Sequence, residues 1–225
     1  RRVYVEKIAG PYPVHCNKRH LKNVPPKPNL ESMTEGTTTK AAGYLERHML
    51  IAMPGMVDNN FAGSVTVLCQ HNDAGAIGIT INRLSDYTLG EVFSQLNLEC
   101  DNEAVRQLPV LEGGPVAPDR GFVLHSPREG YESSMKIDQD IMVTTSRDVL
   151  VEIAAGEGPG KFLVALGDAG WGGGQLEDEM LANAWLPGST VSDSIFDMPV
   201  PSRFDEALGR LGIKVDMLHT EAGHA

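Results

Sequence analysis

The chain has 225 residues with a hydrophobic fraction of 41%, enough for the core of one ordinary domain plus an appendage. No run approaches the roughly 18 apolar residues that cross a bilayer, and the start lacks a secretory apolar stretch, so we expect a cytoplasmic protein without membrane contact. Cys16, Cys69 and Cys100 are widely spaced and form no C-x-x-C pair, which favours free thiols in a reducing compartment.

Charge is divided unevenly along the chain. Residues 1–48 carry nine Lys/Arg against four Asp/Glu, a net of +5. Residues 49–225 carry ten Lys/Arg against 26 Asp/Glu, a net of -16. Because Lys and Arg that neutralise phosphates supply most of the non-specific affinity for nucleic acid, we expect no direct nucleic-acid binding by the acidic part.

Residues 1–44 contain five prolines and a polar run at 34–40, with no sustained apolar period. This composition predicts a flexible N-terminal extension, with a basic arm that docks on an acidic partner as the alternative. The chain begins with Arg1, whereas Met33 lies shortly before the first strongly patterned segment. We therefore expect residues 1–32 to stem from a misplaced start or a cloning artefact, and the domain to span residues 45–225.

Short apolar runs broken by turn residues begin at residue 50. Residues 64–71 (SVTVLCQH) and 76–82 (AIGITIN) are rich in β-branched side chains, and the turn residues 72–75 (NDAG) between them predict an antiparallel hairpin. The TLGE sequence at 88–91 is a capping box, which predicts a short amphipathic helix. Further strands are predicted at 110–112, 121–125, 141–145 and 162–167.

Three more helices follow from helical spacing and caps. Ser146 is predicted to cap a helix that Gly156 ends, and residues 175–185 form a second one that Pro187 stops. A third helix is predicted from about Arg203 to Gly212, with Phe204, Ala207, Leu208 and Leu211 buried, before a closing strand at 213–217. Hairpins precede irregular helix-strand alternation, so we expect an α+β domain with a mixed or antiparallel sheet.

Several of these segments resemble the AlgH/YqgE family of bacterial proteins, in the same order from about residue 45 to 225. The matching residues are 50–54 (LIAMP), Asp58, Phe61, 71–72 (HN), 75–76 (GA), Gly78, 81–82 (IN), 113–116 (GGPV), 120–125 (RGFVLH), 170–171 (GW), 174–177 (GQLE), Glu179, 183–185 (NAW) and 222–225 (AGHA).

The resemblance implies a single compact domain with a bent sheet curled toward a barrel and flanked by short helices, in the bacterial cytosol. It also implies a role as a transcriptional regulator, without an agreed enzymatic activity. The chain departs from the family pattern at Asp168, where an aromatic residue is common, and residues 1–32 exceed the family's usual length.

The glycine-rich run at 170–174 precedes a predicted helix, where backbone N–H groups can hold an anion. It lacks the Lys and Ser/Thr of a P-loop, and the acidic residues 177–179 would repel phosphate, which favours a tight packing turn around Trp171.

Cys69 and His71 are two apart on a predicted strand and are expected to project from one face, where an imidazole can activate a thiol. The alternative is a buried cysteine beside a hydrogen-bonding histidine. His125 and Ser126 end another strand without the motif of a serine hydrolase. The convergence of His71 and His125 with Asp58 or Asp168 stays open. We expect no metal site and no cofactor.

The leading hypothesis is a non-enzymatic regulator that acts through an unknown protein partner or a small-molecule ligand, and not by reading DNA directly. One alternative is an enzyme or small-molecule binder with a pocket near His71, His125 and Trp171, and another is DNA contact through the basic tail. The candidate functional surface consists of His71, Asn72, Asn82, Gly113, Gly114, His125, Trp171 and Gln175, with Cys69 as a candidate reactive thiol.

Overall fold

The computed structural model describes residue 45 and residues 47–213. The predicted N-terminal extension and, apart from Ile213, the predicted closing strand lie outside these residues. None of the helices in the described part has the length and hydropathy to span a bilayer.

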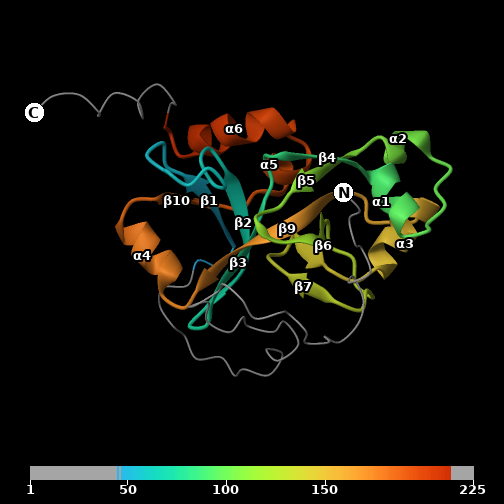
Figure 1. Cartoon of the computed structure of the whole chain (residues 1–225), viewed down its shortest axis with the longest axis horizontal. Coiled ribbons are helices and arrows are strands. Elements are labelled where there is room, and N and C mark those ends of the chain that lie inside the picture. The colour runs from blue at the N-terminus through green and yellow to red at the C-terminus, as the bar shows by residue number, and fades with distance from the viewer. Residues whose placement is uncertain (1–44, 46, 214–225) are drawn as a thin grey trace, which may run out of the picture.

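Ten strands of the described chain form one sheet that curls into a half-barrel (Figure 1). Their spatial order is β10-β1-β2-β3-β9-β6-β8-β7. Outside this order, β5 pairs with β9, and β4 pairs with β5. The strands are β1 (His48–Ala52), β2 (Val65–Asn72), β3 (Gly75–Thr80), β4 (Leu84–Thr88), β5 (Pro109–Glu112), β6 (Val116–His125), β7 (Ser134–Lys136), β8 (Met142–Thr144), β9 (Phe162–Gly172) and β10 (Trp185–Ser189).

Strand β9 organises the sheet because it pairs with three neighbours. It runs antiparallel to β6 and, further along, antiparallel to β3. Its first half also runs parallel to β5 through Leu111↔Ala165 and Glu112↔Leu166. The sheet is therefore mixed, and the α+β fold class predicted from the sequence is confirmed.

Short helices flank the sheet: α1 (Leu89–Gln95), α2 (Glu103–Arg106), α3 (Asp148–Ala155), α4 (Gln175–Leu181), α5 (Ser192–Phe196), the 3-10 helix η2 (Val200–Ser202) and α6 (Arg203–Arg210). The predicted capping box is present, because the Thr88 side chain accepts from Glu91 N while Thr88 N donates to the Glu91 carboxylate. Gly156 ends α3 in the left-handed conformation, as its position indicated.

The predicted helix over 175–185 is wrong beyond Leu181. Asn183 takes a positive φ of 56°, the chain reverses, and Trp185 begins strand β10. Strand β10 pairs with β1 at the edge of the sheet, and an edge strand tolerates Pro187, which has no N–H to donate. Leu181, the last residue of α4, is 83% exposed.

Three smaller predictions also need correction. Strand β9 continues to Gly172 rather than ending at Gly167, so Gly170 and Gly172 lie in a strand and not in a loop. Ser146 does not cap α3, because its hydroxyl donates to Asp148 Oδ1 at 2.5 Å instead. Leu211, expected to be buried, is 39% exposed.

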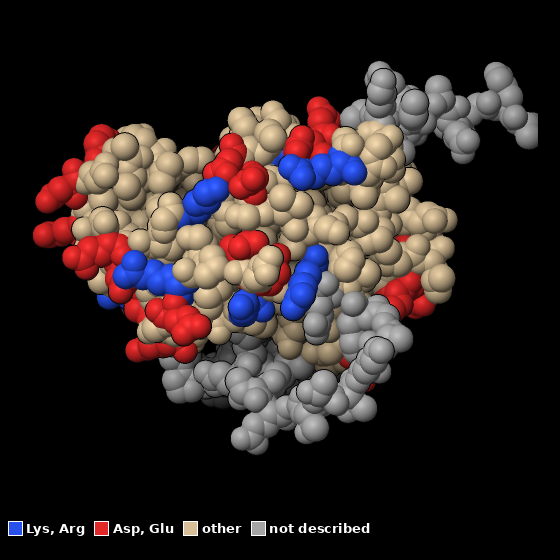
Figure 2. Space-filling view, turned by 180° about the vertical axis from the view of Figure 1, so that it is seen from behind, with Lys and Arg blue, Asp and Glu red and all other residues tan. Residues whose placement is uncertain are grey.

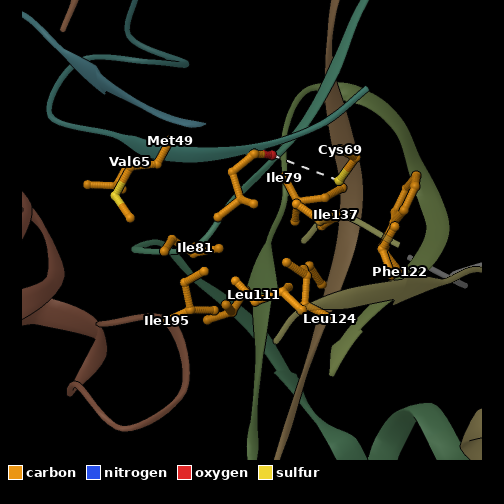
Figure 3. Close-up of a cluster of buried hydrophobic side chains, with 14 of the residues drawn as sticks. Met49, Val65, Cys69, Ile79, Ile81, Leu111, Phe122, Leu124, Ile137 and Ile195 are labelled. Atoms are coloured by element: carbon orange, nitrogen blue, oxygen red, sulfur yellow. Dashed lines mark hydrogen bonds between the residues drawn. The ribbon is translucent and has the colours of Figure 1, made fainter. Parts of the chain in front are cut away.

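Buried side chains form three clusters. The first is the core of the half-barrel and includes Ile79, Ile81 and Leu124 (Figure 3). The second joins α1 and α3 to the sheet, and the third lies beneath α4 around Trp171 and Trp185. Each face of the sheet is thus covered, so the positions of polar side chains on either face are fixed by packing.

Candidate functional site

Helix α4 carries a hydrogen-bonded cluster over the end of β9. One carboxylate oxygen of Glu179 accepts the indole N–H groups of Trp171 at 2.9 Å and Trp185 at 2.8 Å. The other oxygen accepts from Gln175 Nε2 at 2.9 Å, and Gln175 Oε1 accepts from Gly172 N at 3.0 Å. The acceptors of this cluster are therefore engaged by the protein's own donors.

Aromatic rings close the cluster from the side. The Phe61 ring stacks on Trp171 with centroids 6.1 Å apart and meets Trp185 edge-on at 5.6 Å. The two indoles meet edge-on at 5.8 Å. Trp171 is therefore a buried member of this cluster, and the exposed Gln175 contributes two side-chain hydrogen bonds to it.

His71 belongs to the same face of the sheet. It lies opposite Ala76, which lies opposite Trp171, so the three side chains share one rung that faces α4. Leu45 N donates to His71 Nδ1 at 3.0 Å, which leaves the proton on Nε2 to be donated to Glu177 Oε1 at 2.9 Å. The His71 side chain is buried whereas Glu177 is 46% exposed, so the pair connects the core to the surface.

The other residues of the predicted candidate surface make local structural contacts. Asn72 accepts from Ala74 N and forms the turn between β2 and β3. Asn82 accepts from Val65 N at 2.7 Å and donates to Gly63 O at 2.8 Å, which ties the start of β2 to the preceding loop. At Gly113 and Gly114 the chain crosses β9 so closely that an added Cβ would meet its backbone.

His125 lies elsewhere, enclosed by β6 and β8. Its Nδ1 contacts Ser126 O at 2.8 Å and can only donate there, so its Nε2 accepts the hydroxyl of Thr144 at 2.8 Å. The Thr144 oxygen in turn accepts from Ser134 Oγ at 2.5 Å. Burial, reinforced by the charge of Arg128, lowers the pKa of His125 against the opposing bond to Ser126. The imidazole is held neutral with both nitrogens engaged.

His71 and His125 do not share a cavity. His125 pairs with Phe162 at the first residue of β9, whereas Trp171, on the rung of His71, lies nine residues further along the same strand. At about 3.3 Å per residue, the two ends are roughly 30 Å apart. Asp168 is buried between them, and the expected candidate surface is divided into separate regions.

Cys69 and His71 do not share a face, contrary to the sequence prediction. A β-bulge between Leu68 and Gln70 adds one residue to β2, so the alternation of side chains reverses after Cys69. Cys69 points into the half-barrel core, where its thiol approaches Val67 O (Figure 3). Burial, with a smaller contribution from the negative charge of Asp168, raises the pKa of Cys69 to about 12, so the thiol is held neutral at physiological pH.

The sequence interpretation missed Arg203, which the structure buries at the start of α6. The burial of Arg203 could have been inferred from its spacing, because it lies four residues before the buried Ala207 on the apolar face of the helix. Within residues 47–213, no group of three or more His, Cys, Asp or Glu side chains is arranged to hold a metal ion.

Comparisons with known proteins agree with the fold. A family model described as DUF179, AlgH-like, matches residues 49–216. A UPF0301 protein of Burkholderia cenocepacia is 49% identical over 183 residues, covering 80% of this chain and 95% of that protein. A UPF0301 protein of Xanthomonas campestris is 46% identical over 181 residues, covering 80% and 96%.

Two solved structures are similar. The solution structure of the AlgH protein from Pseudomonas aeruginosa superposes with a TM-score of 0.69 at 44% identity, covering 84% of this chain and all of that one. A crystal structure of a Corynebacterium diphtheriae protein gives a TM-score of 0.59 at 17% identity, covering 80% and 91%, and so shares the fold. The chain belongs to the AlgH-like UPF0301 family.

Proposed function

We propose that this protein is a non-enzymatic cytosolic regulator that acts through protein contacts or a small ligand, and that its domain does not read DNA directly. The observation that carries the proposal is the charge of the domain. Residues 47–213 hold ten Lys/Arg against 24 Asp/Glu, a net of -14. A surface with this balance repels a polyanion rather than attracting it.

The cations of the domain are also dispersed and engaged. Figure 2 shows Lys and Arg interspersed with Asp and Glu across the visible face, without a continuous basic stripe. Carboxylates pair with four of the ten, and main-chain carbonyls accept from three more. The ion-paired cations are Arg106, Arg128, Lys161 and Arg210, and the carbonyl-bound ones are Arg83, Arg147 and Arg203.

The state of the candidate catalytic groups supports a non-enzymatic role. The Cys69 thiol is held neutral in the core, and both nitrogens of His125 are engaged in hydrogen bonds. A nucleophile needs an adjacent base, and the bulge at Cys69 directs His71 away from it. The free thiols of Cys69 and Cys100 suit the cytosol.

A gel shift tests the proposal against a pool of genomic DNA fragments at physiological salt. We expect no sequence-specific shift at nanomolar protein with the full chain. Nanomolar, sequence-specific binding would overturn the proposal. Repeating the assay with a chain that starts at Leu45 separates the tail from the domain, because binding through the tail vanishes in the shorter chain whereas binding through the domain persists.

A further inference from the structure

A pocket of about 140 Å³ opens between the C-terminal helices and the sheet. Leu111 of β5 and Phe162 and Leu163 of β9 contribute from the sheet, and Phe196 of α5 and Val200 of η2 contribute from the helices. Figure 1 shows α5 near β5, and α6 packs against α5. Nine of the ten residues that line the pocket are apolar, and the tenth is Arg203.

Two exposed ion pairs link α5 to the residue before β9. Lys161 Nζ, next to the pocket residue Phe162, lies 2.5 Å from Asp197 and 3.4 Å from Asp193, at the two ends of α5. Such exposed pairs contribute little, but Ile195 of α5 is fully buried in the same core cluster as Leu111, so the pocket belongs to the folded architecture rather than to a loop.

The guanidinium of Arg203 is buried, and no side chain of the described residues acts as its counter-ion. Its Nε donates to Met198 O at 3.1 Å, and its Nη1 donates to Ile81 O. A guanidinium has five N–H donors, and among the described residues the other three, on Nη1 and Nη2, have no acceptor. No carboxylate of the described chain pairs with it, and the residue is only 6% exposed.

A buried charge normally has a partner, because removing it from water is costly. Burial lowers the pKa of Arg203 to about 10, which still leaves it protonated at neutral pH. Within the described residues, the site therefore presents a positive charge that has carbonyl acceptors but no carboxylate partner, at an apolar pocket. The two terminal nitrogens of a guanidinium match the spacing of the two oxygens of a carboxylate.

We propose that this pocket binds a small monocarboxylate with a compact apolar body, whose carboxylate pairs with Arg203 and whose body lies against Leu111, Phe162, Leu163, Phe196 and Val200. The volume limits the body to about the size of one six-membered ring, since an apolar cavity of roughly 150 Å³ accepts benzene. A free phosphate would satisfy the guanidinium but would gain nothing from the apolar walls. This inference rests on the proposed function, in which the protein acts through a small ligand, and it assigns that ligand to a chemical class.

The probe is sodium benzoate, titrated into the ¹⁵N-labelled full chain and followed by amide chemical shifts. We expect saturable shifts at Ile81 and along residues 196–203. Benzamide has the same shape without the charge, and charged hydrogen bonds contribute enough that it should bind about tenfold more weakly or worse. Inorganic phosphate should give no saturable shift at the same concentration. Equal binding of benzamide, tighter binding of phosphate, or no saturable shift with benzoate would overturn the proposal.

Arg203→Met removes the charge and should weaken benzoate binding about tenfold or more. Arg210→Met, on the exposed side of the same helix, is the matched control and should bind as the unmodified chain does. If Arg203→Met does not fold, Val200→Phe fills the pocket and leaves Arg203 in place, and it should abolish the benzoate shifts. Unchanged binding in Val200→Phe or in folded Arg203→Met would contradict the proposal. A negative benzoate titration leaves the gel-shift result standing, so failure of the pocket and failure of the proposed function are distinguishable.

Discussion

Trp171 and Trp185 share one hydrogen-bond acceptor, a single carboxylate oxygen of Glu179 that lies 2.9 Å and 2.8 Å from their indole nitrogens. Trp171 lies in β9, which precedes α4 in the chain, and Trp185 begins β10, which follows it. They are the only tryptophans in the sequence. The carboxylate of Glu179 thereby links helix α4 to both flanking strands. Intrinsic tryptophan fluorescence reports directly on this contact.

Glu179→Gln should destabilise the domain by about 1–3 kcal/mol, because a charge-assisted acceptor becomes neutral and its new NH₂ group faces that of Gln175. Urea unfolding followed by tryptophan fluorescence measures the change. Asp178→Asn, on the exposed side of the same helix, is the control and should cost no more than about 0.5 kcal/mol. Equal stability of the two variants would mean that the shared acceptor does not anchor α4.

Acid should destabilise the domain partly through His125. Burial lowers the pKa of this imidazole in the folded state, whereas the unfolded chain takes up the proton near pH 6.5. Between these two pKa values the unfolded state binds more protons. The free energy of unfolding therefore falls with decreasing pH, by about 1.4 kcal/mol per pH unit for this group.

The comparison variant is His125→Gln, which does not titrate. It should be less stable at pH 7 because its hydrogen bonds to Ser126 and Thr144 are altered, yet it should lose less stability between pH 7 and pH 5. Urea unfolding across this pH range gives both curves. Parallel curves would show that His125 is not held neutral in the folded protein.

Gly114→Ala should destabilise the domain by more than about 2 kcal/mol or prevent folding. Gly114 has a φ of 153°, and a Cβ there would meet the main chain of Asp168 and Ala169. Gly130→Ala separates this clash from the cost of backbone conformation, since Gly130 has a φ of 105° and open space around it. The control should cost about 1 kcal/mol. Equal losses in urea unfolding would exclude close packing as the reason for glycine at 114.

Cys69 should resist alkylation in the native protein. With a pKa of about 12, roughly one thiol in ten thousand is a thiolate at pH 8, and the side chain is 92% buried as well. Iodoacetamide labelling with peptide mass spectrometry should find Cys69 unmodified in buffer and modified in urea. Labelling in buffer at the rate of a free thiol would show that Cys69 is accessible and reactive.

The features predicted correctly from the sequence are set by neighbouring residues. The capping box at Thr88 and Glu91 and the turn at residues 72–75 depend on local hydrogen bonds and backbone freedom, which a sequence displays. The resemblance carried by scattered Gly, Pro and Trp residues then supplied the curled sheet.

The features that were missed depend on distant residues. The helix from residue 175 ends early because Trp185 pairs with β1 and donates a hydrogen bond to Glu179. Helical periodicity does not report such contacts. The bulge that separates Cys69 from His71 arises from the register of β2 on β3. Arg203 is buried because Ile81, 122 residues earlier, supplies a carbonyl acceptor. In each case a tertiary contact overrides the local pattern.

The salt dependence of binding to a fluorescent DNA duplex tests the central claim most directly. Each phosphate contact contributes about 0.9 to the slope of log affinity against log salt. We predict weak affinity, micromolar at best, that comes from the tail, so that replacing Lys18 and Arg19 with Gln lowers the slope by about two. Replacing Arg83 and Arg106 with Gln should leave it unchanged. Nanomolar affinity that falls when Arg83 and Arg106 are replaced would contradict the account, because the acidic domain would then itself hold the duplex.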